Sequence, residues 1–376
     1  MKEITLTIES LASTGLGVGR IQEGKFTRAV FVPFTCPGDS VKVKIIEQKK
    51  KYYMGELVKV ITPSLSRVPI RCKHFGVCGS CDLLHIHYDK EVEMKKAFLQ
   101  YMFKEFYSGD ISVLSGSPDF YRQKIRVHAE NGKVGWKKYR SNDLINVEEC
   151  YLIHQPLLPE MRTLQKEEGE FYLVDRGDSV VIADSSDEIT LEDVKKKKVP
   201  ICSYVLNGQN ILFAPSCFIQ NNAEVNEKTV NVVARIFEAE KPTTALELFS
   251  GIGNFSSHIK NCRMTCVEGD EMSSYFATMN APTHHHVHEE VYEFLEKNKK
   301  TYDIVLLDPP REGLREGFEE KIASITDTIV FISCNPSVLK ESLKKMKEFE
   351  VKQMIFADMF PRTHHVEIVV LLRKNA

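Results

Sequence analysis

Residues 207–376 alternate short strand-like runs with helical segments, and this alternation constrains the fold more than any other feature of the chain. Seven runs are candidate strands: "TALELFS", "MTCVEG", "HHHVHE", "YDIVLLDP", "TIVFISC", "QMIFAD" and "EIVVLLR". Helical segments lie between most of them. Strands that alternate with helices form a mainly parallel sheet with helices on both faces. We therefore predict a C-terminal doubly wound α/β domain, which binds its ligands at the carboxyl ends of the strands.

One strand-to-helix junction has the composition of a cofactor site. "ALELFSGIGNFSSHIK" (245–260) is a strand, a glycine-rich turn and a helix, so the backbone can approach a ligand closely at the helix N-terminus. Glu268 ends the next strand, fourteen residues after Asn254, where a carboxylate can accept both hydroxyls of a ribose. The spacing is short for a dinucleotide fingerprint and the third glycine is missing. We therefore predict binding of S-adenosylmethionine.

Two further strands end in reactive or charged side chains. "YDIVLLDPPREGL" places Asp308 at a strand end, and Arg311 stands where amino-group methyltransferases carry an aromatic residue, which disfavours methylation of an exocyclic amine. "TIVFISCNP" places Cys334 at another strand end, because Pro336 cannot donate to the ladder. Taken alone, Cys334 is a core filler, a metal ligand or a nucleophile. Its position before Asn-Pro favours the nucleophile.

The first 206 residues divide into two further regions. Residues 1–62 contain five short strands and glycine-rich turns, which predicts a small closed barrel of the oligonucleotide-binding type. Residues 63–206 form a mixed α+β region with a helix at 88–106 and a hairpin at 120–140. One face of the first hairpin strand carries Arg122, Lys124, Arg126 and His128. We predict that these basic groups and the neighbouring aromatic residues contact RNA; the alternative is a solvated outer face of a sheet.

Charge and composition narrow the class of protein. Residues 1–150 contain 24 Lys and Arg against 17 Asp and Glu, whereas the remainder contains 26 against 35. A basic front half suggests an anionic partner. The N-terminus lacks the apolar region of a signal peptide, and no run of about 18 apolar residues indicates a membrane span. We expect a cytoplasmic protein that does not bind membranes.

Four cysteines are the candidate metal ligands. "RCKHFGVCGSC" contains Cys72, Cys78 and Cys81 in a C-x5-C-x2-C run. Three thiolates so close together in a reducing compartment indicate zinc or an iron–sulfur cluster. Cys150 is the best fourth ligand for a [4Fe–4S] cluster, which we favour, whereas His74 or His154 would complete a zinc site.

These motifs together resemble those of the RNA 5-methyluridine methyltransferase family. "SCNP" after "LLDPPREG", "HHVE" near the C-terminus and "FIQNN" carry the resemblance, which extends over nearly the whole chain. It implies a TRAM domain at 1–62, a central RNA-binding domain with a [4Fe–4S] site at 63–206, and a methyltransferase domain at 207–376. The TRAM-like domain favours the branch of the family that acts on 23S rRNA, while the loop uridine of tRNA is the alternative.

The resemblance also implies roles for individual residues. Cys334 becomes the nucleophile and Glu367 the general base. Phe218 and Gln220 fall where the family holds the flipped base and the cofactor. The matching cofactor positions are Gln220, Phe249, Asn254, Glu268, Glu290 and Asp308. The sequence departs from the family pattern in the Gly-Ser pair before Cys81 and in Ser250, where the family often has cysteine.

The chemistry of uracil explains why a thiol and a carboxylate are needed. C5 of uracil is a poor nucleophile, and addition of a thiolate at C6 activates it; a base must then remove the C5 proton. We expect a strand-end environment that lowers the pKa of the Cys334 thiol. The competing hypotheses are a non-catalytic RNA-binding or chaperone protein and a cytidine methyltransferase. The latter is disfavoured because "LLDPPREG" lacks the second cysteine of those enzymes. We expect the protein to be a monomer.

Overall fold

The structure is a computed structural model that describes residues 3–185 and 189–375. It divides into two compact units, each built from several stretches of the chain. The first unit comprises Met1–Tyr101, Gly135–Tyr151 and Phe360–His365, and the second comprises Met102–Val134, Leu152–Met359 and Val366–Ala376. The predicted domain boundaries at residues 62 and 206 therefore do not coincide with these units, and the three-domain division stays a prediction.

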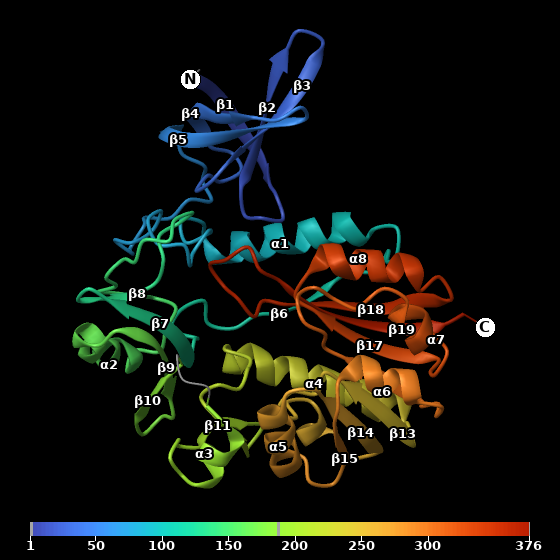
Figure 1. The fold of residues 1–376 in the computed structure, drawn as a ribbon. Helices are drawn as coiled ribbons and strands as arrows, with labels where there is room; N and C mark the ends of the chain where they lie inside the picture. Colours follow the sequence, from blue (N-terminus) through green and yellow to red (C-terminus); the bar gives the residue numbers. More distant parts are fainter. Residues whose placement is uncertain (1–2, 186–188, 376) are drawn as a thin grey trace. The chain divides into compact units, whose positions relative to one another are not determined.

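The N-terminal part of the first unit is the predicted five-stranded barrel (Figure 1). Its closed strand order is β1-β2-β3-β5-β4. Fully buried valines fill the interior of the barrel. Gly19 allows β1 and β2 to lie close together, because a Cβ at this position would lie 2.4 Å from Leu6 Cδ1. The strands are β1 (Glu3–Leu11), β2 (Gly17–Glu23), β3 (Phe26–Val32), β4 (Ser40–Gln48) and β5 (Tyr52–Thr62).

The helix α1 (Tyr88–Phe103) carries a buried ion cluster of the first unit. Glu91 is fully buried and accepts from Lys95 Nζ at 2.8 Å, one helical turn further on. The same carboxylate accepts from the backbone N–H of Arg362 at 2.8 Å. Because a buried charge is stable only when it is paired and hydrogen-bonded, this cluster ties the segment Phe360–His365 to the helix.

The predicted hairpin belongs to a four-stranded sheet of order β10-β9-β7-β8, and its residues up to Val134 lie in the second unit. The hairpin turns at Asn131 and Gly132, both of which have positive φ, as a two-residue turn of this type requires. These strands are β7 (Lys124–Glu130), β8 (Lys133–Gly135), β9 (Gly169–Asp175) and β10 (Val180–Asp184). Beside them in sequence are α2 (Leu157–Thr163), the 3-10 turn η1 (Leu164–Lys166), α3 (Leu191–Lys195) and the strand pair β11 (Cys202–Leu206) and β12 (Gln209–Phe213).

The doubly wound α/β sheet predicted for residues 207–376 is confirmed in the second unit. Its order is β15-β14-β13-β16-β17-β19-β18-β6. Neighbours from β15 to β17 are parallel, and β19 is antiparallel to both β17 and β18. The strands are β13 (Thr244–Leu248), β14 (Arg263–Glu268), β15 (His285–His288), β16 (Ile304–Leu307), β17 (Thr328–Ser333), β18 (Phe349–Ala357) and β19 (Glu367–Lys374).

One edge strand of this sheet comes from an earlier part of the chain. β6 (Ser112–Leu114) pairs in parallel with β18, although sequence patterns place residues 112–114 in the central region. The accompanying helical elements are α4 (Ala223–Glu240), η2 (Ser256–His258), α5 (Glu271–Asn280), α6 (Val291–Lys297), α7 (Phe318–Ala323) and α8 (Pro336–Lys345). None of the described helices is long and apolar enough to cross a membrane.

Candidate active site

Cys334 lies in a tight turn between β17 and α8. Asn335 is the N-cap of α8, and its side-chain oxygen accepts from the backbone N–H of Ser337 at 3.2 Å and of Val338 at 3.4 Å. Pro336 occupies the first helical turn, where its missing N–H costs no hydrogen bond. The backbone N–H of Asn335 also donates to Ser333 Oγ at 3.2 Å. The sequence "SCNP" therefore ends the strand and fixes the position of Cys334 at the carboxyl end of β17.

Strand register brings Glu367 to the same point. In the antiparallel pair of β17 and β19, Ser333 is the partner of Ile368. The next pair in this register is Cys334 and Glu367, and residues directly opposite each other have Cβ atoms about 4.5–5.5 Å apart. Glu367 is only 4% exposed. The predicted nucleophile and the predicted base, 33 residues apart in the chain, are therefore neighbours in the sheet.

Asp308 completes a group of three titratable side chains. It follows β16, the neighbour of β17 in the sheet, and its backbone N–H points to the Leu248 carbonyl at 3.5 Å. Burial raises the pKa of Asp308 to about 7. Burial, and then the negative charge of Asp308, hold the pKa of Glu367 well above its usual value. At neutral pH a larger fraction of these two carboxyl groups is therefore protonated than of exposed acids.

The same surroundings act on the thiol in the direction opposite to our expectation. Burial, followed by the carboxylates of Glu367 and Asp308, raises the pKa of Cys334 to about 11, and Arg311 offsets this only in part. The expectation of a lowered pKa is therefore wrong for this structure. The main cause is that burial disfavours the charged thiolate, and the two neighbouring acids add to this effect more than Arg311 offsets it.

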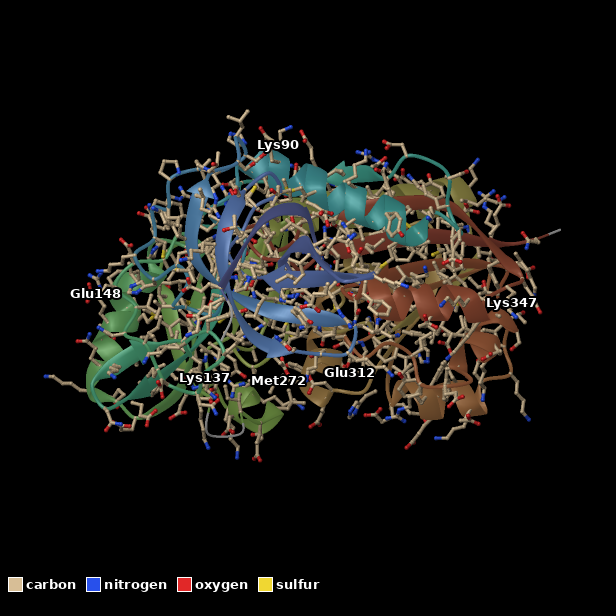
Figure 2. The ribbon with its side chains drawn as sticks, turned by 90° about the horizontal axis from the view of Figure 1, so that it is seen from above. Lys90, Lys137, Glu148, Met272, Glu312 and Lys347 are labelled. Atoms are coloured by element: carbon tan, nitrogen blue, oxygen red, sulfur yellow. The ribbon has the colours of Figure 1, made fainter. Side chains whose placement is uncertain are left out.

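The loop after Asp308 is joined to the Cys334 turn by one hydrogen bond. The side-chain N–H of Asn335 donates to the Arg311 carbonyl at 3.2 Å. Arg311 is exposed, as is Glu312, whose side chain is labelled in Figure 2. Asn335 therefore caps a helix with its oxygen and holds the Arg311 loop with its nitrogen.

The glycine-rich turn after β13 has the geometry of a cofactor loop. Phe249, Gly251 and Gly253 have positive φ, which turns the backbone sharply at the strand end. The Glu268 carboxylate accepts from the backbone N–H of Gly251 at 2.7 Å and of Asp270 at 2.8 Å. Burial nevertheless raises the pKa of Glu268, although these hydrogen bonds lower it. This carboxylate thus links the ends of β13 and β14.

Two other predicted cofactor residues lie near this turn. A Cβ at Gly269 would lie 3.0 Å from Glu290 Oε1, so the Glu290 carboxylate adjoins the segment that follows Glu268. The Phe249 ring packs edge-on against Tyr292, with centroids 5.8 Å apart.

Asn254 points to protein partners instead. Its side-chain amide exchanges two hydrogen bonds with Asn226, at 2.8 and 3.0 Å, and its oxygen accepts from the Tyr204 hydroxyl at 3.2 Å. Its side chain therefore braces the turn against α4, and the cofactor role predicted for it stays a prediction.

The predicted substrate segment alternates between exposed and buried side chains. Phe218 is 71% exposed, whereas Cys217 and Ile219 are buried in the core. Gln220 is 7% exposed, and its Oε1 has no hydrogen-bond partner among the described residues. A buried amide oxygen without a partner costs free energy, and a bound ligand that donates to it would remove that cost.

The three basic residues predicted to contact RNA differ in exposure. Arg126 is exposed and forms an ion pair with Glu170, whose Oε1 also lies 3.1 Å from His128 Nδ1. Arg122 is half-buried and makes backbone bridges to Ile153 and Asn222. Lys124 donates to the Cys217 carbonyl, and burial lowers its pKa to about 8. Of the three, Arg126 presents the most open cation.

All four candidate cluster cysteines belong to the first unit and are half-buried. The loop around them is fixed by backbone bonds, such as that from Cys78 N–H to the His74 carbonyl at 2.7 Å. Burial, then Glu149 and Cys78, raise the pKa of the Cys72 thiol, which places Cys72 and Cys78 within electrostatic range. However, the described residues contain no group of three or more His, Cys, Asp or Glu arranged to hold a metal ion.

The histidines considered for a zinc site have other partners. His74 Nε2 accepts from the backbone N–H of Glu148 at 3.2 Å, and the exposed Glu148 side chain is labelled in Figure 2. His154 belongs to the second unit, where its Nδ1 lies 2.9 Å from Asp175 Oδ2. These contacts occupy one ring nitrogen of each histidine, and the choice between zinc and an iron–sulfur cluster stays a prediction.

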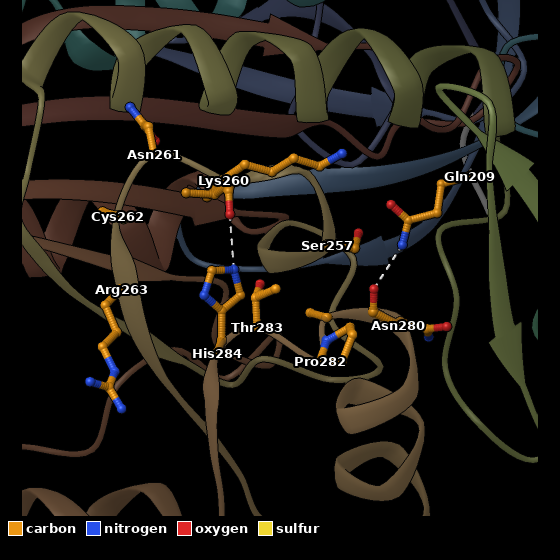
Figure 3. Close-up of a pocket in the computed structure, with 12 residues that line it drawn as sticks. Gln209, Ser257, Lys260, Asn261, Cys262, Arg263, Asn280, Pro282, Thr283 and His284 are labelled. Atoms are coloured by element: carbon orange, nitrogen blue, oxygen red, sulfur yellow. Dashed lines mark hydrogen bonds between the residues drawn. The ribbon is translucent and has the colours of Figure 1, made fainter.

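A pocket of about 710 Å³ lies away from these residues, at the amino ends of β14 and β15 (Figure 3). Lys260, Arg263 and His284 are among its lining residues, and the side-chain amide of Gln209 donates to the Asn280 carbonyl at 2.7 Å across one wall. None of the predicted site residues lines this pocket. It lies at the end of the strands opposite to Glu268.

One buried acid near the candidate site was missed by the sequence reasoning. Glu247 lies in the middle of β13, is fully buried, and its Oε2 has no hydrogen-bond partner among the described residues. Burial raises its pKa to about 7. Its signal in the sequence was an acidic residue within the apolar run "TALELF", which is unusual for a buried strand.

Comparisons with known proteins match both ends of the chain and its full length. A family model described as tRNA (uracil-5-)-methyltransferase matches residues 257–375. Another, described as the TRAM domain of tRNA (uracil(54)-C(5))-methyltransferase, matches residues 4–65. Together the two models cover the barrel and most of the α/β sheet.

Curated relatives and a solved structure extend over nearly the whole chain. The 23S rRNA (uracil(1939)-C(5))-methyltransferase RlmD of Aeromonas hydrophila is 29% identical, over 100% of this chain and 97% of its own. That of Vibrio parahaemolyticus is 27% identical, over 98% and 95%. The crystal structure of Pyrococcus abyssi tRNA (uracil-54, C5)-methyltransferase with S-adenosyl-L-homocysteine has a TM-score of 0.78 at 21% identity, and covers 98% of this chain and 100% of that one. This structural likeness confirms the fold.

Proposed function

We propose that the chain is a member of the RNA uracil-C5-methyltransferase family, which its matches to both family models and its full-length relatives support, and that it transfers a methyl group from S-adenosylmethionine to C5 of a uridine in structured RNA. The observation that carries the proposal is that Cys334, Glu367 and Asp308 lie close together, at the carboxyl ends of β16 and β17 and the amino end of β19. Methylation of uridine at C5 needs a thiol and a carboxylate that act on the same uracil ring. The pairing of β17 with β19 brings Cys334 and Glu367 together for this purpose. The expectation of an S-adenosylmethionine-dependent enzyme is confirmed by the family and its full-length relatives.

The reaction begins at the thiol. The Cys334 proton passes to a neighbouring carboxylate, and Asp308 suits this role because its pKa of about 7 lets it exchange protons near neutral pH. The sulfur then bonds to C6 of the uracil, and the electron pair of the C5–C6 double bond moves into the enolate. Bound S-adenosylmethionine would supply an electrophilic methyl group, which the nucleophilic C5 accepts while the thioether S-adenosylhomocysteine leaves.

Glu367 completes the reaction by elimination. After methyl transfer, C5 carries both the new methyl group and its original proton. Glu367 removes that proton, the C5–C6 double bond re-forms, and the bond between C6 and sulfur breaks. A raised pKa makes Glu367 a stronger base once it is ionised than an exposed glutamate would be. The same step returns Cys334 as a thiolate.

The flanking residues supply base and cofactor binding. We propose that the exposed ring of Phe218 stacks on the flipped uracil. We also propose that Gln220 Oε1, which has no partner among the described residues, accepts a hydrogen bond from a bound ligand. Phe249, Asn254, Glu268 and Glu290 surround the glycine-rich turn and form the proposed S-adenosylmethionine site. Arg122, Lys124 and Arg126 form the basic strand beside it, with Arg126 as the proposed phosphate contact.

We further propose that Cys72, Cys78, Cys81 and Cys150 hold a [4Fe–4S] cluster. Support comes from the donor chemistry: four cysteines of one unit, three of them in a C-x5-C-x2-C run, are a complete thiolate set. No step of methyl transfer passes through the cluster, so its role is structural. An anaerobic preparation should contain about four iron and four sulfide per chain; stoichiometric zinc instead would contradict this assignment.

The proposed substrate is 23S rRNA, because full-length relatives bear that name, and the protein is proposed to act in the cytoplasm as a monomer. A tRNA loop uridine is the alternative, since both family models are described for tRNA enzymes. Incubation with methyl-labelled S-adenosylmethionine and either RNA, followed by nucleoside analysis, should yield labelled 5-methyluridine in rRNA. Full activity of Cys334→Ala would contradict the proposed function.

A further inference from the structure

We propose that Lys124 is a positioning residue that holds the substrate segment Cys217–Asn222, and is not an RNA contact. The inference rests on the proposed function, because Phe218 and Gln220 belong to this segment. The segment follows β12 without regular secondary structure of its own, so other parts of the second unit must fix its path. The start of β7 supplies those contacts.

The backbone of β7 and the residues before it bind this segment. Gln123 N–H donates to the Asn221 carbonyl at 3.4 Å, and Lys124 N–H donates to Asn221 Oδ1 at 3.2 Å. Arg122 and Asn222 form an isolated antiparallel bridge. Residues 221 and 222 are thus held like a short extra strand beside the basic hairpin.

The Lys124 side chain fixes the other end of the segment. Its ammonium donates to the Cys217 carbonyl, and its Nζ lies 4.8 Å from the centroid of the Tyr172 ring. Burial lowers the pKa of this lysine to about 8. Lys124 is half-buried, and an ammonium that is partly withdrawn from water is stabilised when its partners are well placed, as the Cys217 carbonyl and the Tyr172 ring are. The ammonium spans from β7 to the carbonyl that precedes Phe218.

Because the segment is held at Cys217 and at Asn221, the residues between them take fixed directions. Ile219 points into the core and Gln220 is buried, whereas Phe218 projects outward. An aromatic ring that is exposed in the free protein stays oriented only if its backbone is rigid. Lys124 thereby couples the basic strand, where RNA is proposed to bind, to the ring proposed to stack on the flipped base.

The main test compares Lys124→Met, which keeps most of the apolar stem but removes the ammonium, with Lys299→Met, an exposed lysine in the loop before β16. Amide hydrogen exchange over residues 216–222 should be at least tenfold faster in Lys124→Met than in the parent, and unchanged in Lys299→Met. This measurement needs no activity, so it can fail independently of the proposed function. Equal exchange in both variants would overturn the inference.

A kinetic cycle separates positioning from general destabilisation. We expect Lys124→Met to lower kcat/KM for RNA about tenfold or more while the Kd for S-adenosylmethionine changes less than threefold. If Lys124 acts through Phe218, the double variant Lys124→Met, Phe218→Ala should be no worse than Phe218→Ala alone. If the loss of kcat/KM in the double variant equals the product of the losses in the two single variants, the two residues act independently and the inference is contradicted.

A second variant covers the case in which Lys124→Met does not fold. Asn221→Ala removes the acceptor for Lys124 N–H but leaves the lysine in place. Asn221→Ala should also speed amide exchange over residues 216–222. Combined with Phe218→Ala, it should cause no further loss of kcat/KM. Unchanged amide exchange in Asn221→Ala would contradict the proposal that these contacts hold the segment Cys217–Asn222 in place.

Discussion

At the scale of single residues, the central feature is that the proposed nucleophile, Cys334, lies in an environment that disfavours its thiolate. Burial, and then the carboxylates of Glu367 and Asp308, raise the pKa of Cys334 to about 11, which keeps the thiol protonated in the free protein. A thiol that is inert until RNA and cofactor arrive is protected from oxidation and alkylation. The cation of S-adenosylmethionine and the nearby Arg311 would then favour the thiolate, because opposite charges stabilise the ionised form.

This arrangement predicts how the thiol responds to a change at Glu367. In Glu367→Gln the negative neighbour is removed, so the pKa of Cys334 should fall below 11 and its alkylation should begin at lower pH. Peptide-resolved alkylation rates between pH 7 and 11 measure this shift. Glu312→Gln, an exposed carboxylate in the neighbouring loop, is the control and should leave the profile unchanged. A shift to higher pH in Glu367→Gln would refute the electrostatic explanation.

At the scale of elements, the candidate site depends on the ends of β13, β16, β17 and β19. Sequence patterns identified each of these strands and the residues at their ends, because apolar runs and Pro336 mark them clearly. They could not reveal that β19 lies antiparallel beside β17, since strand order is set by packing of the whole sheet. The register that ends at Ser333 and Ile368, and so brings Glu367 close to Cys334, is therefore a structural result. The resemblance to a family supplied the same two residues by a different route.

The turn between β17 and α8 gives a prediction that separates stability from activity. Asn335→Asp keeps the acceptor that caps α8 but loses the amide donor to the Arg311 carbonyl. We expect its Tm to stay near that of the parent while kcat falls several-fold. Asn335→Ala loses both interactions and should also lower the stability by about 1 kcal/mol. Thermal unfolding and methyl transfer measured on both variants test this, and equal kcat values for Asn335→Asp and the parent would argue against a role for the Arg311 loop.

The buried Glu247 in β13 gives a stability prediction with a defined pH window. Its pKa rises from 4.5 to about 7 on folding, so the folded state binds a proton more tightly than the unfolded state. Stability should therefore decrease as pH rises from about 4.5 to 7, and the penalty should persist above 7. Glu247→Gln removes this penalty and should raise the free energy of unfolding at pH 8 by about 1–3 kcal/mol. Denaturant unfolding at pH 4 and pH 8 measures it; a gain that is larger at pH 4 would contradict the explanation.

At the scale of the whole molecule, the sequence predicted more of the architecture than of the contacts. The barrel and the doubly wound sheet are confirmed because their patterns are local. The placement of β6 in the sheet and the contact of Lys124 with the Cys217 carbonyl were missed, since both depend on partners far away in the sequence. The pKa of Cys334 was predicted in the wrong direction for the same reason: it is raised by burial in the folded sheet and by acids that come from two other strands.

The proposed cluster also acts at this scale, because it would stabilise one unit of the chain. Removing iron with a chelator under mild denaturant should lower the unfolding temperature of the first unit and weaken RNA binding. The S-adenosylmethionine affinity of the second unit should stay within about twofold. Calorimetry and cofactor binding before and after chelation measure both effects. A Cys150→Ser variant should reproduce them, whereas unchanged stability after loss of iron would exclude a structural role.

The central claim is a covalent bond between Cys334 and C6 of the target uridine. RNA that contains 5-fluorouridine tests it most directly, because Glu367 cannot remove fluorine from C5 and the methylated adduct cannot eliminate. Denaturing electrophoresis and peptide mass analysis should reveal RNA joined to Cys334 only when S-adenosylmethionine is present, and no adduct in Cys334→Ala. An adduct at another cysteine, or labelled 5-methyluridine formed by Cys334→Ala, would contradict the account.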